Sequence, residues 1–173
     1  MHERNMQASA AMLRSRGIDI VRFNFPYTEK GSRRPDPMPV LRASYEGVVA
    51  RARELPHRRL IIGGRSMGGR VASMLAADGL ACEGLLLFAY PLHPAGRPEK
   101  LRDAHLPRIK VPVLCFNGTR DALCRRDLME RALQTVTTRW EMHWIEGADH
   151  SLKGDKALEE MGAAVSAWLQ RIA

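Results

Sequence analysis

One serine in this sequence lies in a glycine-rich turn that could make it a nucleophile. Residues 64–68 read Gly-Arg-Ser-Met-Gly, after an apolar run and before a helical pattern that begins at Val71. This G-x-S-x-G spacing is that of a nucleophile elbow, a strained strand-to-helix turn that lifts the serine hydroxyl above a parallel sheet. We expect side chains at Gly64 and Gly68 to collide where the strand and the helix pass closest. The alternative is that Ser66 only caps the helix.

A serine hydroxyl needs a base that takes its proton and an acid that orients the base. Asp121 lies in the loop after a predicted strand at 111–117, and His150 lies in the loop after a predicted strand at 139–145. The chain order Ser66, Asp121, His150 is that of the α/β hydrolases. The combined pattern predicts a Ser-His-Asp triad that transfers acyl groups to water. Alternatively, Asp121 closes an Asx turn and His150 is an ordinary loop histidine.

Other polar residues compete for roles at this site. Asp149 adjoins the histidine in sequence and would orient it only with awkward geometry, while Asp127 falls inside a predicted helix. His93 and His105 lie in a proline-rich loop, where we expect them to brace turns.

Two arginines flank the predicted catalytic residues. Arg65 precedes the serine and Arg120 precedes the acid, so either could bind a carboxylate on the substrate. The alternative, which we favour from the sequence, is that they brace loops or lie on the surface.

The elements that must position these residues alternate along the chain. Predicted helices and strands occupy 4–16 (helix), 18–24 (strand), 38–54 (helix), 59–63 (strand), 67–78 (helix), 83–89 (strand), 111–117 (strand), 125–135 (helix), 139–145 (strand) and 155–171 (helix). This alternation predicts one α/β domain over residues 1–173, with a mostly parallel sheet, helices on both faces and ligand chemistry at the carboxyl ends of the strands. The loop at 91–110 is too short for a typical lid domain, which favours an open site and a small or exposed substrate.

Composition favours a compact globular domain. The 173 residues carry a formal net charge of +8, but the basic residues are scattered and form no basic stripe interleaved with aromatics. Nucleic acid is therefore an unlikely partner, although nonspecific polyanion binding is an alternative. No apolar run is long enough to span a membrane. The three cysteines lack metal-ligand spacing, so we expect no metal site, no disulfide framework and a cytoplasmic location.

Four separated segments carry a family resemblance that extends over essentially the whole chain. They are 21–27 (Val-Arg-Phe-Asn-Phe-Pro-Tyr), 63–70 (Gly-Gly-Arg-Ser-Met-Gly-Gly-Arg), 90–94 (Tyr-Pro-Leu-His-Pro) and 118–121 (Gly-Thr-Arg-Asp). The chain resembles the small dienelactone-hydrolase-like α/β hydrolases. It is more closely similar to a bacterial branch related to testis-expressed hydrolase-like proteins and a eukaryotic chromatin-complex subunit.

The resemblance implies a serine hydrolase with an ester-like small-molecule substrate and no metal or organic cofactor. It implies Ser66 as nucleophile, His150 as base, Asp121 as acid and the Met67 amide as one oxyanion donor. It implies no particular substrate.

The amino terminus departs from the family pattern. That pattern begins with a strand ending in His-Gly-x-Gly, whose loop supplies a second oxyanion amide, whereas this sequence begins at Met1-His2-Glu3-Arg4. We therefore expect an amino-terminally truncated fold, with a vacancy between the strands at 18–24 and 59–63. An upstream start, a shift of the strand at 18–24, or a second chain that pairs with the open edge as a homo-oligomer would each repair it.

The missing segment bears on activity. Loss of one oxyanion donor typically lowers turnover on the order of 100- to 1,000-fold. The sequence therefore leaves a weak hydrolase and a non-catalytic interaction module of the same fold as alternatives.

Overall fold

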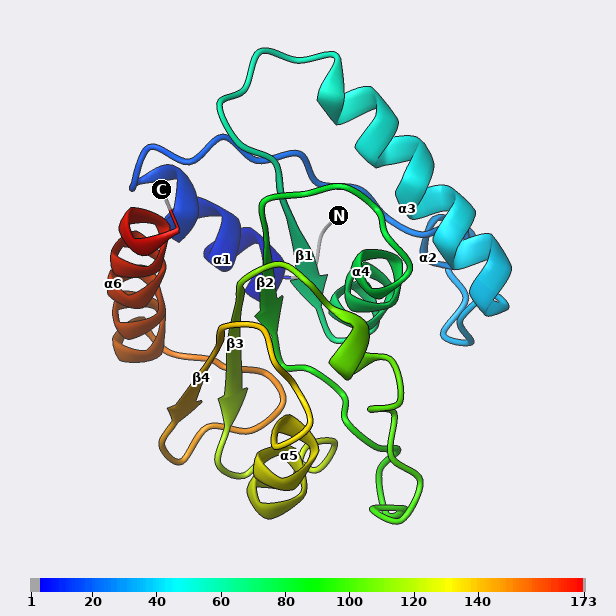
Figure 1. Ribbon diagram of the computed structural model, residues 1–173, viewed down its shortest axis with the longest axis vertical. Helices are drawn as coiled ribbons and strands as arrows, with labels where there is room; N and C mark the ends of the chain where they lie inside the picture. Colours follow the sequence, from blue (N-terminus) through cyan, green and yellow to red (C-terminus); the bar gives the residue numbers. More distant parts are fainter. Residues whose placement is uncertain (1–3, 173) are drawn as a thin grey trace.

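The computed structural model describes residues 4–172, in which four strands form one parallel sheet. The strands β1 (Ile61–Arg65), β2 (Gly84–Phe88), β3 (Val113–Gly118) and β4 (Trp140–Ile145) are neighbours in chain order. Their carboxyl ends therefore lie along one edge of the sheet, as the arrowheads in Figure 1 show. The loops that carry the predicted catalytic residues leave from this edge.

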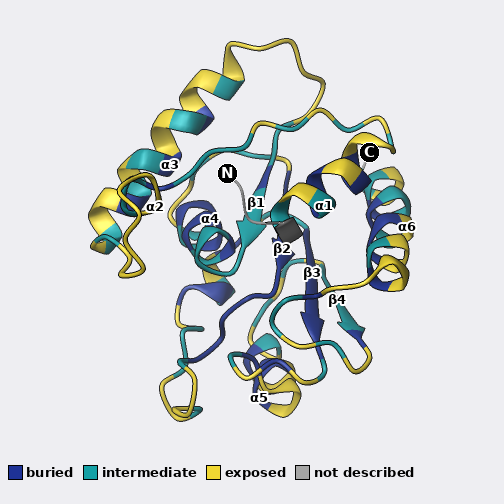
Figure 2. Cartoon of the chain, turned by 180° about the vertical axis from the view of Figure 1, so that it is seen from behind, coloured by how far each residue is buried: buried dark blue, intermediate teal, exposed yellow. Residues whose placement is uncertain are grey.

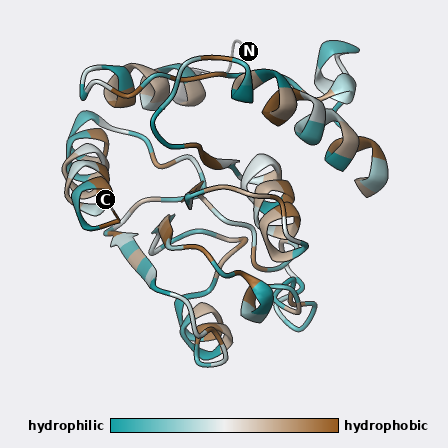
Figure 3. Ribbon diagram, turned by 45° about the horizontal axis from the view of Figure 1, so that its top comes forward, coloured by the Kyte–Doolittle hydropathy of each residue, from teal (hydrophilic) through white to brown (hydrophobic). Residues whose placement is uncertain are grey.

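Helices cover both faces of the sheet. One apolar cluster joins it to α3 (Met38–Arg53), α4 (Met67–Ala77) and α5 (Arg126–Leu133), and a second joins it to α1 (Arg4–Arg14) and α6 (Asp155–Arg171). Side chains alternate between the faces, so that Leu85 and Leu87 belong to the first cluster and Leu86 packs on the second. Figure 2 shows β2 and β3 as the buried centre. In Figure 3 hydrophobic and hydrophilic residues mix along the helices, as expected where one face of each packs on a sheet.

Most predicted elements are present within a few residues of their expected bounds. The last helix has the predicted bounds, and β1, β3 and α5 begin one or two residues later than expected. A short helix α2 (Pro26–Glu29), absent from the prediction, begins with a proline at its first turn. The prediction that concerns residues 1–3 lies outside the described residues.

The prediction of a strand at 18–24 is wrong. These residues have no regular secondary structure, and among residues 4–172 no strand pairs with the outer edge of β1. The side chains of Phe23 and Phe25 instead pack edge-on against each other, and Phe23 packs against Tyr45. The segment has the β-branched and aromatic composition of a strand, but a strand also needs a ladder partner.

A tyrosine hydroxyl occupies part of the outer edge of β1. The carbonyl of Leu60 and the amide of Ser66 both bond toward β2. Because successive residues of a strand point their backbone groups to opposite sides, the N–H and C=O of Gly63 point away from β2. The Tyr45 hydroxyl on α3 donates to the Gly63 carbonyl at 2.5 Å and accepts from the Gly63 amide at 2.8 Å. This one side chain therefore supplies at Gly63 the two bonds that a neighbouring strand would make.

Within the described residues, no helix has the length and apolar character needed to cross a membrane.

Candidate active site

Ser66 lies at the junction of β1 and α4, in the geometry expected of a nucleophile elbow. Its backbone has φ +50° and ψ −116°, a conformation that a non-glycine residue rarely adopts. The Ser66 amide donates to the Phe88 carbonyl at 2.9 Å, and the Ser66 carbonyl accepts from the Arg70 amide at 3.0 Å, which fixes the turn to β2 and to α4. The side chain makes no capping bond to the helix. The helix-cap interpretation is therefore wrong.

Close packing of β1 on α4 depends on glycine at two positions. A Cβ on Gly64 would lie 2.9 Å from the Gly68 carbonyl carbon, and one on Gly69 would lie 2.7 Å from the Gly64 carbonyl oxygen. Both distances are too short for any side chain. The expectation for Gly68 was wrong, because a Cβ there would meet nothing within 4 Å. The backbone atoms of Gly68 and Gly69 lie against Gly64, whereas the position of a Cβ on Gly68 points into open space.

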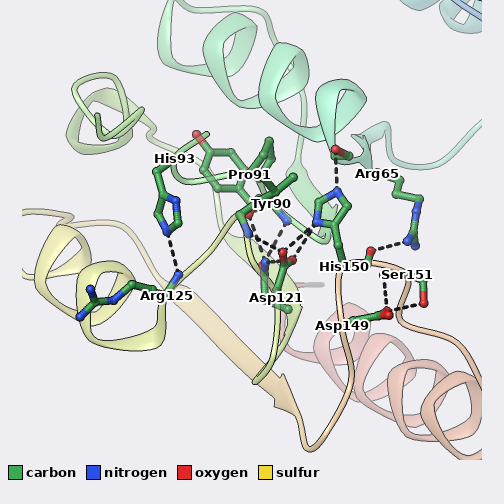
Figure 4. A network of polar contacts seen from close by, with 12 residues as sticks. Arg65, Tyr90, Pro91, His93, Asp121, Arg125, Asp149, His150 and Ser151 are labelled. Carbon is green, nitrogen blue, oxygen red and sulfur yellow. Dashed lines mark hydrogen bonds and ion pairs between the residues drawn. The ribbon is translucent and has the colours of Figure 1, made fainter. Parts of the chain in front are cut away.

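The three side chains predicted as a triad lie in one hydrogen-bonded chain. Figure 4 shows the contact between Asp121 and His150. The Nε2 atom of His150 lies 2.9 Å from the Ser66 Oγ. The Nδ1 atom of the same ring lies 2.8 Å from Oδ2 and 3.0 Å from Oδ1 of Asp121. With Nδ1 protonated toward the carboxylate, Nε2 is left as the acceptor that faces the serine hydroxyl. The arrangement can take a proton from Ser66 and stabilise the resulting imidazolium.

The acid of this chain is buried and held by three groups. The Asp121 side chain is 0% exposed, whereas the His150 side chain is 30% exposed. In addition to the histidine, Oδ1 accepts from the Leu123 amide at 2.8 Å and Oδ2 accepts from Asn117 Nδ2 at 3.1 Å. A buried carboxylate requires such donors to offset its desolvation. These bonds leave the carboxylate one orientation, toward the histidine ring.

The sequence pattern did not single out Asn117, which holds Asp121 in the structure. Its Oδ1 accepts from the Tyr90 amide at 3.1 Å, and its Nδ2 donates to the Tyr90 carbonyl, also at 3.1 Å. These two backbone bonds fix which end of the amide carries the donor, so the remaining N–H must face Asp121. The available signal was a polar residue at the end of the buried strand 111–117, fully buried in the structure.

The loop that carries His150 is fixed from two sides. Arg65 Nη2 donates to the His150 carbonyl at 2.5 Å, which ties the loop to β1. On the other side, a Cβ on Gly118 would lie 2.1 Å from the Ala148 carbonyl oxygen, which also accepts from the Arg120 amide at 2.9 Å. The loops after β3 and β4 therefore touch through their backbones, and the side chains of Asp121 and His150 come together as a result.

Other residues singled out from the sequence have structural contacts. The Arg120 side chain is exposed, and its positive charge contributes to a lowered pKa of Asp149. The main cause of that lowering is the bonding of Asp149 to Ser151 rather than to the histidine. Asp127 lies in α5 and pairs with Arg125.

The side chains of His93 and His105 join the segment at 91–110 to the start of α5 and to α4. His93 accepts from the Arg125 amide at 3.1 Å, and His105 bonds to Ser73 at 2.8 Å. Met67 is the first residue of α4, where amide groups have no acceptor within the helix. The oxyanion amide that the resemblance assigns to a His-Gly-x-Gly loop would precede residue 4, outside the described residues.

Backbone strain gathers around the site. Ser66, Ala89 and Leu152 are the non-glycine residues with positive φ in the part of the chain that the structure describes. Ala89 directly follows β2, and Leu152 lies two residues after His150. Such conformations cost about 1 to 3 kcal/mol each and persist where the surroundings hold them.

The described residues offer no metal centre at this site. Across residues 4–172, no group of three or more His, Cys, Asp or Glu side chains could hold a metal ion. A cavity of about 580 Å³ lies between residues 76–82 and 107–111, at the far end of α4 from Ser66. The side chains of Ser66, Asp121 and His150 lie at the carboxyl edge of the sheet, away from this cavity.

Comparison with known proteins shows the family and the fold. The sequence model of the family described as "Alpha/beta hydrolase domain" matches residues 1–172. An α/β serine hydrolase homologue from Coxiella burnetii superposes with a TM-score of 0.78 at 19% identity, covering 98% of this chain and 77% of that one.

Two further solved structures are similar. A dienelactone hydrolase from Anabaena variabilis has a TM-score of 0.70 at 21% identity, covering 98% of this chain and 80% of the other. A Xanthomonas campestris protein described as an α/β serine hydrolase without a lid has a TM-score of 0.69 at 25% identity. The match covers 99% of this chain and 74% of the other.

Proposed function

Because this chain belongs to the alpha/beta hydrolase domain family, we propose that it is a serine hydrolase that transfers acyl groups from ester-like small molecules to water. The observation that carries the proposal is the continuous hydrogen-bonded chain from Ser66 through His150 to the buried Asp121. An ordinary loop histidine would have no reason to bridge a strained serine and a buried carboxylate.

The proposed reaction has two halves. Ser66 Oγ attacks the carbonyl carbon of the ester while His150 Nε2 takes the hydroxyl proton, and Asp121 stabilises the imidazolium. The Met67 amide donates to the oxyanion. As the tetrahedral intermediate collapses, the bond to the alcohol breaks and the alcohol leaves with the proton from His150. A water molecule then attacks the acyl-enzyme, giving its proton to His150, and Ser66 recovers its hydrogen when the acid departs.

The surroundings of the site favour a small or exposed substrate. The segment between β2 and β3 contains only a short 3₁₀ turn at Leu106–Arg108, so it forms no helical lid over the triad. The lidless description of the Xanthomonas campestris protein is consistent with such an open site.

Active-site labelling tests the proposal. A fluorophosphonate reacts with a serine whose oxygen is activated by a base, so we expect covalent labelling of the wild-type chain and none of Ser66→Ala. Ser44→Ala is the matched control, because Ser44 bonds only to a backbone carbonyl of its own helix, and this variant should label like the wild type. An unlabelled wild-type chain that is folded by circular dichroism would refute a serine mechanism.

A further inference from the structure

The segment that leaves β2 is buried although it has no regular secondary structure. Tyr90 and Leu92 are 0% exposed, and His93 is 2% exposed. A buried loop must find partners for its backbone N–H and C=O groups elsewhere in the chain. The segment is part of the motif Tyr-Pro-Leu-His-Pro at 90–94, which has no role in the reaction proposed above.

These partners lie largely at the end of β3 and in the turn that carries the acid. The backbone groups of Tyr90 bond to the Asn117 side chain. The His93 amide donates to the Leu123 carbonyl at 3.0 Å. The Leu123 amide in turn donates to Oδ1 of Asp121 at 2.8 Å. Leu123 therefore bonds to His93 through its carbonyl and to the acid through its amide.

The His93 side chain makes a second bond to the same turn, as Figure 4 shows. Its Nε2 accepts from the Arg125 amide at 3.1 Å. Because a backbone amide can only donate, Nε2 carries no proton, and the ring proton lies on Nδ1. This Nδ1 donates to the Pro94 carbonyl at 3.0 Å. Both ring nitrogens are therefore bonded, and the neutral ring has one orientation.

Two bonds from one residue restrict the turn more than one bond would. A bond at Leu123 alone leaves residues 121–125 able to pivot about it, whereas the bond at Arg125, two residues further on, opposes that motion. A pivot would move the Leu123 amide away from the Asp121 carboxylate to which it donates. A displacement of about 1 Å at a reacting site can lower a rate on the order of 100-fold.

We propose that His93 is a positioning residue for the acid: it holds the turn at 121–125 so that Asp121 stays bonded to His150. Its bonds go to backbone groups of its own loop and of the turn, so it acts through Asp121 and takes no part in proton transfer. This role rests on the proposed serine hydrolase function.

Two substitutions separate the acceptor atom of the ring from its bulk. His93→Leu fills similar space without an acceptor, whereas His93→Gln offers an amide oxygen to the Arg125 amide. On p-nitrophenyl acetate, His93→Leu should lower kcat about tenfold or more and change KM less than about twofold, because the imidazolium is stabilised only during the reaction. His93→Gln should recover most of this loss. An unchanged kcat in His93→Leu, or an equal loss in both variants, would overturn the proposal.

A double substitution tests whether His93 acts through Asp121. If the two residues act as one unit, His93→Leu should add little to the loss caused by Asp121→Asn, because the oriented carboxylate is already gone. The rate of fluorophosphonate labelling reports on these slow variants. An equal fold-loss from His93→Leu with and without the Asp121 carboxylate would show an effect on general stability and refute the positioning role.

His105 provides the matched control, because it is a buried histidine of the same segment that bonds to Ser73 on α4 instead of the acid turn. His105→Leu should lower the melting temperature, as His93→Leu does, but should leave kcat unchanged. A loss of kcat as large as that of His93→Leu would mean that any buried histidine of the segment has this effect, which contradicts the proposal.

Proton NMR separates this inference from the proposed reaction. The His150 Nδ1 proton, bonded to a buried carboxylate, should give a resonance far downfield of the amides, identified by its loss in His150→Gln. His93→Leu should shift or remove it, whereas His93→Gln and His105→Leu should keep it. This result in a wild-type chain that fluorophosphonate does not label would support the positioning role and refute the serine mechanism. Labelling of the wild type together with an unchanged resonance in His93→Leu would refute the positioning role alone.

Discussion

At the scale of single residues, Asn117 helps to hold the Asp121 carboxylate toward the His150 ring. Its amide takes both backbone groups of Tyr90 and gives its remaining N–H to Asp121. The bond therefore couples the end of β2 to the acid that follows β3.

We expect Asn117→Ala to lower kcat on a neutral p-nitrophenyl ester by about tenfold or more, because a hydrogen bond to a buried carboxylate is lost. Asn117→Asp should lower it further, since it places a second carboxylate against Asp121. Steady-state kinetics on both variants, with folding checked by near-ultraviolet circular dichroism, measure the effect. A kcat within twofold of the wild type for both folded variants would show that Asn117 does not position the acid.

His105 makes the free energy of unfolding depend on pH. Its pKa is about 4 in the folded chain because of burial, against an ordinary value of 6.5. Between these values the unfolded chain binds a proton that the folded chain does not, so stability rises with pH across the window and is lost as pH falls. Measured by urea unfolding, the free energy of unfolding should fall as pH is lowered from about 7 to about 5. In His105→Gln this fall should be smaller by on the order of 1 kcal/mol.

The exposed His57 provides the control for this pH dependence. His57→Gln should keep the wild-type slope of stability against pH. If His105→Gln shows the wild-type slope as well, His105 is not the cause of the pH dependence of stability.

At the scale of elements, the outer edge of β1 depends on one hydroxyl from α3. Tyr45→Phe leaves the ring in place but removes both partners of the Gly63 backbone. We expect a loss of about 1 to 3 kcal/mol in the free energy of unfolding, because buried polar groups lose their hydrogen bonds. Chemical denaturation measures it, and Tyr27→Phe, which removes a hydroxyl that makes no hydrogen bond to a described residue, should change stability much less. Equal losses in the two variants would argue against an edge-capping role.

Elements were predictable from sequence where local pattern decides them. The helix at 155–171 has its predicted bounds because its apolar periodicity and the preceding glycine are both local features. The segment 18–24 shows the limit, since its composition suits a strand but pairing depends on a partner elsewhere in the chain. The site follows the same division. The elbow at Ser66 is a local pattern, and strand ends indicated Asp121 and His150, but Asn117 acquires its role only when Tyr90 arrives from another strand.

At the scale of the whole molecule, the Tyr45 hydroxyl on the outer edge of β1 should limit self-association. A strand edge with free backbone groups can pair with another chain. The Tyr45 hydroxyl bonds to the outward N–H and C=O of Gly63. Because Tyr45→Phe leaves these groups free, we expect this variant to form more dimer than the wild type in sedimentation velocity experiments. The outward amide of Ile61 would take part in such pairing, so adding Ile61→Pro should reduce the dimer again. Dimer that persists in the double variant would place the contact elsewhere.

The strained turn at Ser66 has a consequence for protein engineering. A glycine adopts φ +50° without the penalty that serine incurs, so Ser66→Gly should relax the elbow and stabilise the chain. The same change removes the hydroxyl on which the proposed reaction depends. A library screened for heat resistance alone would therefore enrich variants that have lost the proposed nucleophile, and only a screen that also scores ester hydrolysis would retain it.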